Sequence, residues 1–393
     1  MLDTIPAPTL DRARIAAITA AITCVAVVGI GLSLSIPLLS IEMARMGASS
    51  TLIGVNTAVS GLASILTVPF VPRLAARIGV VPLLLWAIGI GAACLVGFRL
   101  LPTIGWWFVL RFAFSAALGA LFVLSEFWIN EAAPPARRGL VMGIYATVLA
   151  LGFAVGPTLL AVLGTQGFAP YLAGAVLFLA GMLPILMARG LSPAIAQGPG
   201  RRFATYLRIA PAATLAALVY GAVETGGFAI LPLYGLRLGY DAETAAGLVS
   251  ALALGNVLFQ IPFGWLADRI DRRVVLLIAA AGGALGAALI PAASASFPVL
   301  VGLLFAWGGI AGTLYTVGLA HLGASVRGAD LAGANAAFVV LYNVGLMLGP
   351  PLIGGGMDLV PPQGFAWTLS ALFVLYGAVV LWRLRGPAAM ARP

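Results

Sequence analysis

Three ionisable side chains fall inside long apolar stretches of the chain, where a charge is costly, and each is therefore a candidate functional group. They are Glu224, Glu126 and Arg111. Glu224 lies roughly 22 Å along a helix from the start of its apolar stretch, near the expected midplane of a bilayer. Tyr220 lies one helical turn away and could donate a hydrogen bond to it. A carboxylic acid in such surroundings resists ionisation, so Glu224 is predicted to bind and release a proton or cation; the alternative is a permanently neutral side chain bonded to a neighbouring helix.

Glu126 and Arg111 belong to one apolar stretch but are too far apart to pair, because they lie roughly 22 Å from each other along a helix. Glu126 is predicted either to bind a proton or substrate or to pair with an Arg at a cytoplasmic gate, and Phe122 shares its helical face. Arg111 keeps its charge, so it is expected to neutralise a carboxylate, bind an anionic group, repel protons or bond to helix carbonyls.

Further polar and aromatic side chains follow helical spacing and could line a substrate path. Asn256 and Gln260 are one turn apart, and Asn335, Phe338 and Tyr342 follow a spacing of three and then four residues. Amides also join membrane helices to one another, and buried aromatic rings often only pack, so a structural role is the alternative throughout. The predicted substrate-binding set is Tyr220, Phe122, Asn256, Gln260, Asn335, Phe338, Tyr342, Trp307 and Tyr315.

The composition requires that these groups sit in a membrane protein. Of 393 residues, 62% are hydrophobic and only 8% are charged, and the mean hydropathy is +1.10. Water-soluble domains carry about 25% charged residues, so that class is excluded. The two cysteines, Cys24 and Cys94, lie in apolar stretches and indicate neither a disulfide framework nor a metal site.

Apolar runs of about 20 residues, the length needed to cross a bilayer, are separated by Pro, Gly and Arg. We expect an all-α integral membrane protein with twelve transmembrane helices. The predicted spans are 15–40, 51–72, 80–101, 106–131, 140–163, 168–188, 209–235, 243–266, 274–293, 298–321, 331–356 and 364–384.

The Arg residues predict the orientation of these spans. Apart from Arg111, seventeen Arg residues lie between spans or near span ends on the side that holds both termini, whereas Arg45, Arg99 and Arg237 fall on the other. Both termini are therefore expected in the cytoplasm, with the chain a multi-pass protein of a bacterial inner membrane. The formal net charge of +9 is then a topology signal, and no nucleic-acid partner is expected.

The chain repeats itself at half length. The segment from Arg77 corresponds to the segment from Arg269 at an offset of 192, and Gly152-x-x-x-Gly156-Pro157 corresponds to Gly345-x-x-x-Gly349-Pro350 at an offset of 193. Two six-helix bundles, 1–188 and 209–393, are predicted around a cytoplasmic linker, 189–208. The glycines and prolines of both motifs are expected to let helices pack closely and bend.

Several motifs resemble those of the major facilitator superfamily, over essentially the whole length. Gly264-Trp-Leu-Ala-Asp268-Arg269-Ile-Asp-Arg272-Arg273 resembles its cytoplasmic loop motif, although the first-half counterpart, Pro72 to Gly79, lacks the Gly and the Asp. Arg111 resembles the buried Arg of the family, and the run from Glu131 to Gly139 resembles the exit from the same helix. The Gly-Pro motif in the fifth span resembles the antiporter motif without its last glycines, and the eleventh span carries the fuller version. The overall arrangement of these motifs is similar to that of bacterial YcaD-like transporters and drug:proton antiporters.

This resemblance implies two pseudo-symmetric six-helix bundles and gating by cytoplasmic loops. Asp268 is expected to sit against a helix N-terminus and nearby Arg groups in one conformation and to lose them in the other. His321, the single histidine, cannot form a metal site alone and is also assigned to the gate. The predicted gate residues are Asp268, Arg269, Arg272, Glu131, Arg137, Arg138 and His321.

The function expected is proton-coupled efflux of a cationic or neutral amphipathic compound by antiport, in which substrate and proton compete for Glu224. An importer of a sugar, amino acid or organic acid, working by symport or facilitation, is the alternative. A sensor or membrane enzyme is a minor alternative, because no catalytic or phosphate-binding motif is present. The expected partners are a small-molecule substrate and the lipid bilayer, with a proton as coupling ion, no cofactor, no metal and a monomeric state.

Overall fold

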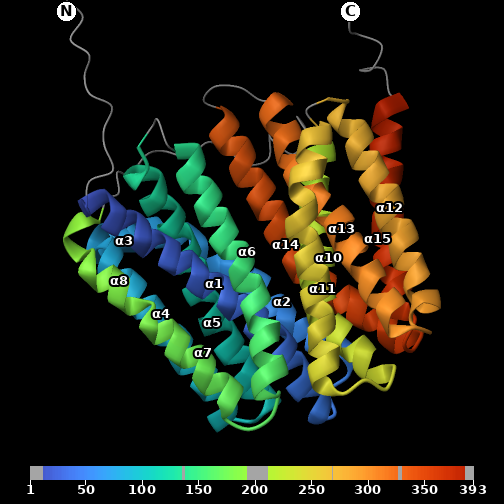
Figure 1. Ribbon diagram of the computed structural model, residues 1–393, viewed down its shortest axis with the longest axis horizontal. Helices are drawn as coiled ribbons and strands as arrows, with labels where there is room; N and C mark the ends of the chain where they lie inside the picture. Colours follow the sequence, from blue (N-terminus) through green and yellow to red (C-terminus); the bar gives the residue numbers. More distant parts are fainter. Residues whose placement is uncertain (1–11, 135–137, 193–210, 268, 326–329, 386–393) are drawn as a thin grey trace, which may run out of the picture. The chain divides into compact units, whose positions relative to one another are not determined.

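The computed structural model describes residues 12–134, 138–192, 211–267, 269–325 and 330–385, and within these ranges every regular element is a helix. Eleven helices are long and apolar enough to cross a membrane, and Thr147–Leu163 is a shorter apolar helix within α6. Each of the twelve predicted spans corresponds to helical structure, which confirms the all-α class (Figure 1). The long helices are α1 (Arg12–Arg45), α2 (Ser50–Thr67), α4 (Val80–Leu100), α5 (Ile104–Ala132), α6 (Arg138–Leu163), α7 (Ala169–Ala180), α10 (Pro211–Arg237), α11 (Ala242–Ala267), α12 (Arg272–Ala293), α13 (Phe297–Ser325), α14 (Asp330–Leu359) and α15 (Gly364–Arg385).

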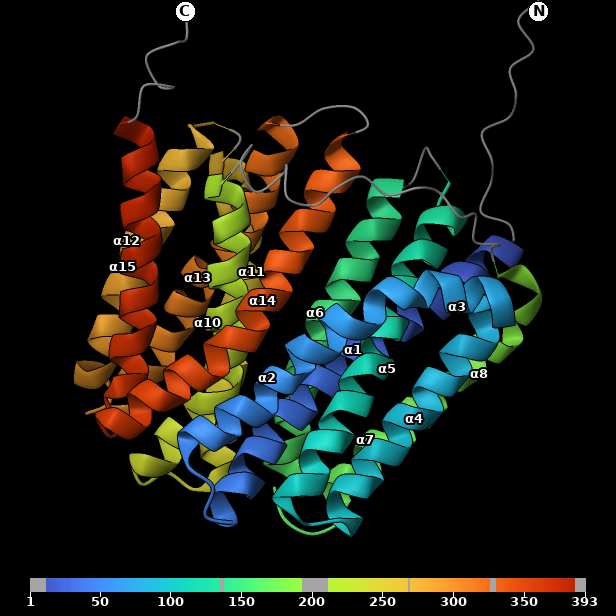
Figure 2. The same ribbon diagram turned by 180° about the vertical axis from the view of Figure 1, so that it is seen from behind.

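The helices form two compact units, which we describe separately. Unit 1 consists of the described residues within Met1–Ser35, Leu66–Leu159 and Gln166–Gly198. Inside it α4 packs between α5 and α7, and Figure 2 shows the run of α4 beside α7. Glycines allow the closest approach of α1 and α6, because a Cβ on Gly152 would meet the backbone of Gly29 at 3.0 Å.

Unit 2 consists of the described residues within Ile36–Ile65, Leu160–Thr165 and Pro199–Pro393. It therefore includes the end of α1 and most of α2 as well as the helices from α10 to α15. Here α10 packs chiefly against α14, α11 against α13, and α12 against α13 and α15. In its most hydrophobic stretch α10 is 83% buried, which makes it the most enclosed of the candidate spans in the described residues. Polar residues on α10 are accordingly the best protected from the surroundings.

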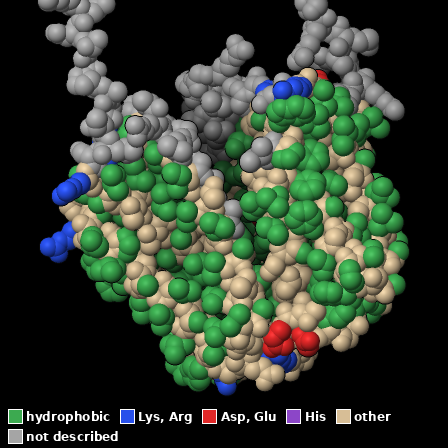
Figure 3. Space-filling model, viewed as in Figure 1, with side chains coloured by type: hydrophobic (Ala, Val, Ile, Leu, Met, Phe, Trp, Pro, Cys, Tyr) green, Lys and Arg blue, Asp and Glu red, His purple; other side chains and the backbone are tan. Residues whose placement is uncertain are grey.

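Large apolar side chains cover the outer faces of the helices in both units. Trp86 of unit 1 is 68% exposed, and Leu375 of unit 2 is 66% exposed. On the face shown in Figure 3, hydrophobic side chains cover the sides of the helices, and the few charged side chains lie near helix ends. An apolar surface of this extent is suited to lipid rather than water.

Capping residues fix several of the helix ends. Asp271 accepts a hydrogen bond from the backbone N–H of Arg273 and caps α12. Ser49 accepts one from Leu52 at the start of α2. Asp241 accepts one from the backbone N–H of Thr244 at the start of α11, and this bond lowers the pKa of the Asp241 carboxyl.

The first-half loop after the second span is more ordered than its sequence indicated. A 3₁₀ turn, η1 (Val68–Phe70), interrupts the end of the predicted span 51–72 and leads into a short helix, α3 (Val71–Ile78), which continues where a loop was expected. Pro72 occupies the first turn of α3, a position that suits proline, and Gly79 with φ 93° ends the helix. The sixth span is also interrupted, because Gly181 separates α7 from α8 (Met182–Met187), which is followed by η3 (Arg189–Leu191).

Candidate functional site

Glu224 lies on the enclosed helix α10 and accepts hydrogen bonds at both carboxylate oxygens. The hydroxyl of Tyr220, one turn earlier on the same helix, donates to Oε1 over 2.6 Å. The hydroxyl of Tyr342 on α14 donates to Oε2, also over 2.6 Å. The predicted partner Tyr220 is therefore in place, and Tyr342, predicted for the substrate path, bonds the same carboxylate. The two donors come from different helices, so Glu224 joins α10 to α14.

A chain of amides extends this cluster to α11. Asn256 Nδ2 donates to the hydroxyl oxygen of Tyr220 over 2.8 Å, and Gln260 Nε2 lies 3.5 Å from Asn256 Oδ1. Gly312 on α13 faces Asn256 and leaves it room, because a Cβ there would collide with the amide oxygen. The donor direction runs along the chain from Gln260 toward Glu224. Gln260 is exposed and Glu224 is half-buried, so the chain of hydrogen bonds connects the acid to the edge of the helix packing.

Aromatic rings enclose the same acid. The ring centroids of Tyr220, Tyr315 and Tyr342 lie 5.4 to 5.9 Å from one another. Phe338 packs edge-on against Tyr315 at 5.2 Å and is fully buried. Four helices, α10, α11, α13 and α14, thus supply one polar and aromatic cluster, which we call the Glu224 cluster. The remaining member of the predicted stripe on α14, Asn335, has a side chain outside the described residues.

The hydrogen bonds of the Glu224 cluster depend on the protonation state of the carboxyl group, because both of its oxygens are acceptors here. Both phenol hydroxyls donate, so the arrangement satisfies an acceptor carboxylate. A protonated carboxyl would donate one hydrogen itself, and one of the two hydroxyls would then have to turn away or become an acceptor. Gain or loss of a proton therefore changes contacts on α14 or α11. In the described part of the chain no group of three or more His, Cys, Asp or Glu side chains could hold a metal ion.

Trp307, also predicted to bind substrate, lies in a packing environment instead. It is 1% exposed, its indole N–H donates to the carbonyl of Gly283 over 2.8 Å, and its ring meets Phe373 edge-on at 6.0 Å. Gly283 lies on α12 and Phe373 on α15, so Trp307 contributes to the packing of both helices against α13. The contacts of the Trp307 side chain are accordingly made with other parts of the protein.

Three predicted residues belong to α5 in unit 1 and are described only within that unit. Arg111 is buried, as its position in an apolar stretch indicated, at 1% exposure. Glu126 is exposed on the surface of α5, and Phe122, one turn before it, is half-buried. Arg111 and Glu126 therefore differ in exposure, and their separate partners remain a prediction.

The predicted gate residues can be located only in part. Arg269 places its guanidinium 3.6 Å from the ring centroid of Trp265 and donates to the carbonyl of the same residue over 3.3 Å. Arg272 begins α12, Glu131 is exposed near the end of α5, and His321 is half-buried near the end of α13. Asp268 and Arg137, and the side chain of Arg138, lie outside the described residues, so the gate remains a prediction.

The motif glycines lie at close contacts between helix backbones. In unit 2, a Cβ on Gly345 or Gly349 of α14 would collide with the backbone of α10 near Ala222. In unit 1, a Cβ on Gly156 of α6 would collide with the backbone of α1 at Leu34. Close packing is therefore a present role of these motifs, and the bending assigned to Pro157 and Pro350 remains a prediction.

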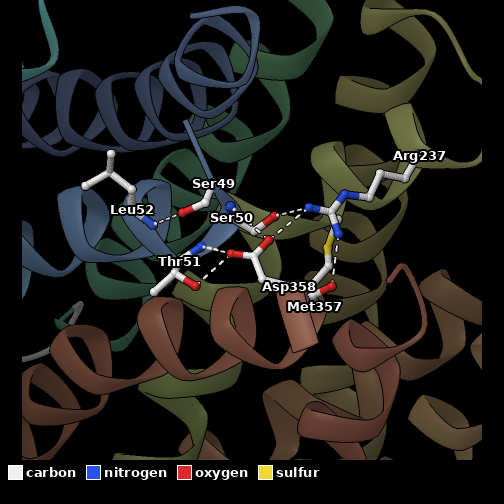
Figure 4. Close-up of polar contacts among 7 residues, drawn as sticks. All are labelled: Ser49, Ser50, Thr51, Leu52, Arg237, Met357 and Asp358. Carbon is white, nitrogen blue, oxygen red and sulfur yellow. Dashed lines mark hydrogen bonds and ion pairs between the residues drawn. The ribbon is translucent and has the colours of Figure 1, made fainter. Parts of the chain in front are cut away.

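A charged cluster that sequence reasoning missed lies at one end of unit 2 (Figure 4). Asp358 of α14 accepts hydrogen bonds at one oxygen from the backbone of Ser50 (3.2 Å) and from Arg237 (2.9 Å), and at the other from the backbone N–H (2.8 Å) and hydroxyl (2.7 Å) of Thr51. Arg237 also donates to the hydroxyl of Ser50 and to the carbonyl of Met357, each over 2.9 Å. The sequence signal is the rarity of Arg on this side, but the positive-inside tendency already accounts for that rarity and does not predict a cluster.

Comparison with known proteins gives consistent matches along the chain. The sequence profile described as Major Facilitator Superfamily matches residues 21–256 and 214–393. An uncharacterised transporter of this type, YfkF of Bacillus subtilis (strain 168), is 26% identical over 338 residues, covering 84% of this chain and 86% of YfkF. YcaD of Escherichia coli O6:K15:H31 is 27% identical over 253 residues, covering 63% of this chain and 65% of YcaD.

Solved structures show the same fold. A mutant of the nucleoside transporter NupG superposes with a TM-score of 0.78 at 16% identity, covering 95% of this chain and 100% of that one. A bacterial homologue of the human lysosomal transporter Spinster, inward-facing and unoccupied, has a TM-score of 0.73 at 14% identity, covering 96% of this chain and 99% of that one.

Proposed function

The chain belongs to the Major Facilitator Superfamily, and from that membership we propose that it is a proton-coupled exporter of cationic or neutral amphipathic small molecules. The family assignment and the relatives make it a multi-pass membrane transporter that works by alternating access, and not an enzyme. The proposal concerns what drives transport, in which direction, and of which compounds.

The observation that carries the proposal is the bonding of Glu224. A carboxyl group inside a membrane helix is costly, so such groups are usually functional. This one accepts hydrogen bonds from two hydroxyl groups on two helices. Proton binding would disturb one of those donors, which supports coupling between the proton and the packing of α10 with α14. A substrate cation that reached the carboxylate would compete with the proton, as antiport requires.

Three aromatic rings around an acid support an amphipathic cation as substrate. Tyrosine faces attract cations as well as apolar groups, and the carboxylate would supply the countercharge. Arg111 and Glu126 remain candidate partners in proton coupling.

The direct test is a pH-dye assay in everted vesicles with an acid lumen. Lipophilic cations, sugars, carboxylates and nucleosides would be added one class at a time from outside. We expect lipophilic cations to cause proton release by the wild type and expect the Glu224→Gln variant to lose it. The Gln side chain keeps the volume but removes the titratable group. Proton release unchanged in Glu224→Gln would contradict the proposal.

A matched control separates loss of this carboxyl from loss of any carboxyl. Asp241→Asn removes one acid outside the cluster and retains a good helix cap at the start of α11, because Asn and Asp cap equally well. Its proton release should match that of the wild type. Equal amounts of inserted protein, measured by gel filtration of detergent extracts, complete the comparison.

Import remains the second candidate function, because the Glu224 cluster also presents uncharged polar groups. The hydroxyls of Tyr220 and Tyr342 and the amides of Asn256 and Gln260 could bond the hydroxyls of a sugar or nucleoside. Arg111 would serve an organic acid or amino acid. The two directions differ in intact cells: an exporter lowers the accumulation of its substrate on expression, whereas an importer raises it.

A further inference from the structure

The end of unit 2 at which α2 and α11 begin carries one arrangement of residues twice. Arg45 ends α1 and Arg237 ends α10, and the two are 192 residues apart, which is the offset of the internal repeat. Each is followed two positions later by a glycine with positive φ, Gly47 at 81° and Gly239 at 91°. A short turn and a capped helix follow in both cases. The repeat is therefore preserved in local structure at these ends.

The first copy is the cluster around Asp358 (Figure 4). Arg237 and the first turn of α2 share the two oxygens of Asp358, so three helix ends meet there. A carboxylate is favourable at the N-terminus of α2, and the Arg is favourable at the C-termini of α10 and α14.

The second copy contains Arg45, Thr165 and Glu243. Arg45 donates to the carbonyl of Thr165 over 3.1 Å and to its hydroxyl over 2.7 Å, and it also pairs with Glu42. The backbone N–H and hydroxyl of Thr165 lie 3.4 and 3.5 Å from Oε1 of Glu243, in the first turn of α11. Thr165 thus bridges Arg45 to Glu243, and three separate chain segments again meet at this point.

The two copies correspond position by position, with the acid exchanged. Thr165 and Asp358 are 193 residues apart, and Thr51 and Glu243 are 192 apart, which are the two offsets of the repeat. In the first copy the acid belongs to the segment that approaches the helix N-terminus. In the second copy the acid belongs to the first turn of the helix itself. Each copy thus keeps one threonine and one acid at these two positions: in the first copy the acid bonds Arg237 directly, and in the second Thr165 lies between Arg45 and Glu243.

The helix backbones also touch beneath the first copy. A Cβ on Gly354 of α14 would collide with the backbone of Ser50, and one on Gly54 of α2 would collide with the backbone of Pro350. Separation of α2 from α14 at this end would therefore break both the backbone packing and the bonds of Asp358. Arg237 and Asp358 remain partly exposed, with side chains 33% and 25% accessible, so water can replace their bonds when they part.

We propose that these two clusters, which we call the twin latches, hold one end of the transport path closed and open together when the path opens to that side. The inference rests on alternating access alone. It requires neither proton coupling nor any particular substrate, so it can fail or succeed independently of the exporter assignment.

Thiol labelling without substrate tests the proposal. In a background with Cys24→Ala and Cys94→Ala, single cysteines are placed one turn inside each latch, as Ile53→Cys on α2 or Ala246→Cys on α11, both at buried positions. A membrane-impermeant maleimide is added to intact cells and to everted vesicles. Asp358→Asn should speed labelling from one side by about tenfold, which corresponds to loss of roughly 1.4 kcal/mol of closure free energy.

The decisive comparison is between the two reporters. If the latches close one conformation, Asp358→Asn and Glu243→Gln each speed labelling at both reporters by a similar factor. Acceleration at the adjacent reporter alone, or at neither, would overturn the proposal, because it would show local fraying or no role. Asp241→Asn is the matched control: it removes an acid at the same end that only caps its own helix, and labelling at both reporters should be unchanged.

Exchange of residues between the copies tests their equivalence. Glu243→Thr alone should open the second latch and speed labelling. Adding Thr165→Asp places an Asp and a Thr at the positions that correspond to Asp358 and Thr51 of the first latch, and should return labelling to the wild-type rate. Persistent fast labelling in a double variant that elutes like the wild type in gel filtration would contradict the equivalence.

Discussion

At the scale of single residues, a packing role and a substrate-binding role for Trp307 predict different effects of substitution: loss of stability in the first case and a changed KM in the second. Trp307→Phe removes the hydrogen bond to Gly283 and part of the packing against Phe373. We expect it to destabilise the protein by about 1 to 3 kcal/mol, with the KM for substrate unchanged. Thermal unfolding in detergent and initial transport rates measure the two effects. Trp86→Phe, at an exposed position, serves as control and should change neither.

The Glu224 cluster shows how far residue types and spacing can lead. Glu224 and Tyr220 were predictable as a pair because they lie one turn apart on one helix. Tyr342 and Asn256 were recognised as candidates, but their bonds to that pair depend on how α14 and α11 pack, which no local pattern encodes. The latches were missed for the same reason, since Arg237 and Asp358 are far apart in the sequence.

At the scale of helices, the contact between α10 and α14 depends on glycine. Gly349→Ala places a methyl group against the backbone at Ala222, where no side chain can move aside. We expect a loss of about 1 to 3 kcal/mol in stability, together with slower transport because α10 carries Glu224. Gly355→Ala, on the same helix, would place its methyl group 3.8 Å from the hydroxyl of Thr51 and should be tolerated. Equal unfolding temperatures of the two variants would contradict this account.

The helices themselves were largely predictable, because long apolar runs leave few alternatives to a membrane span. The differences lie where the chain leaves the apolar runs. Helix α3 combines Arg73 and Arg77 with apolar residues, so it lacks the continuous hydrophobicity by which spans are recognised. The break at Gly181 is small and does not interrupt the apolar run, and for that reason hydropathy could not reveal it.

At the scale of the whole molecule, the distribution of Arg predicts which way the protein faces. Each latch contains one of the three Arg residues assigned to the side opposite the termini: Arg237 in the first and Arg45 in the second. If the positive-inside tendency holds, the latches face the outside of the cell, and their closure leaves the path open only toward the cytoplasm.

Fusion reporters test this orientation. Green fluorescent protein joined to the C-terminus should fluoresce, and alkaline phosphatase joined there should be inactive, because that enzyme requires export to fold. Phosphatase joined after Val360, between α14 and α15, should be active. An active phosphatase at the C-terminus would place the latches in the cytoplasm instead. In that case the maleimide would reach the opened latches only in everted vesicles, so labelling sidedness and fusion activity must agree if one orientation accounts for both.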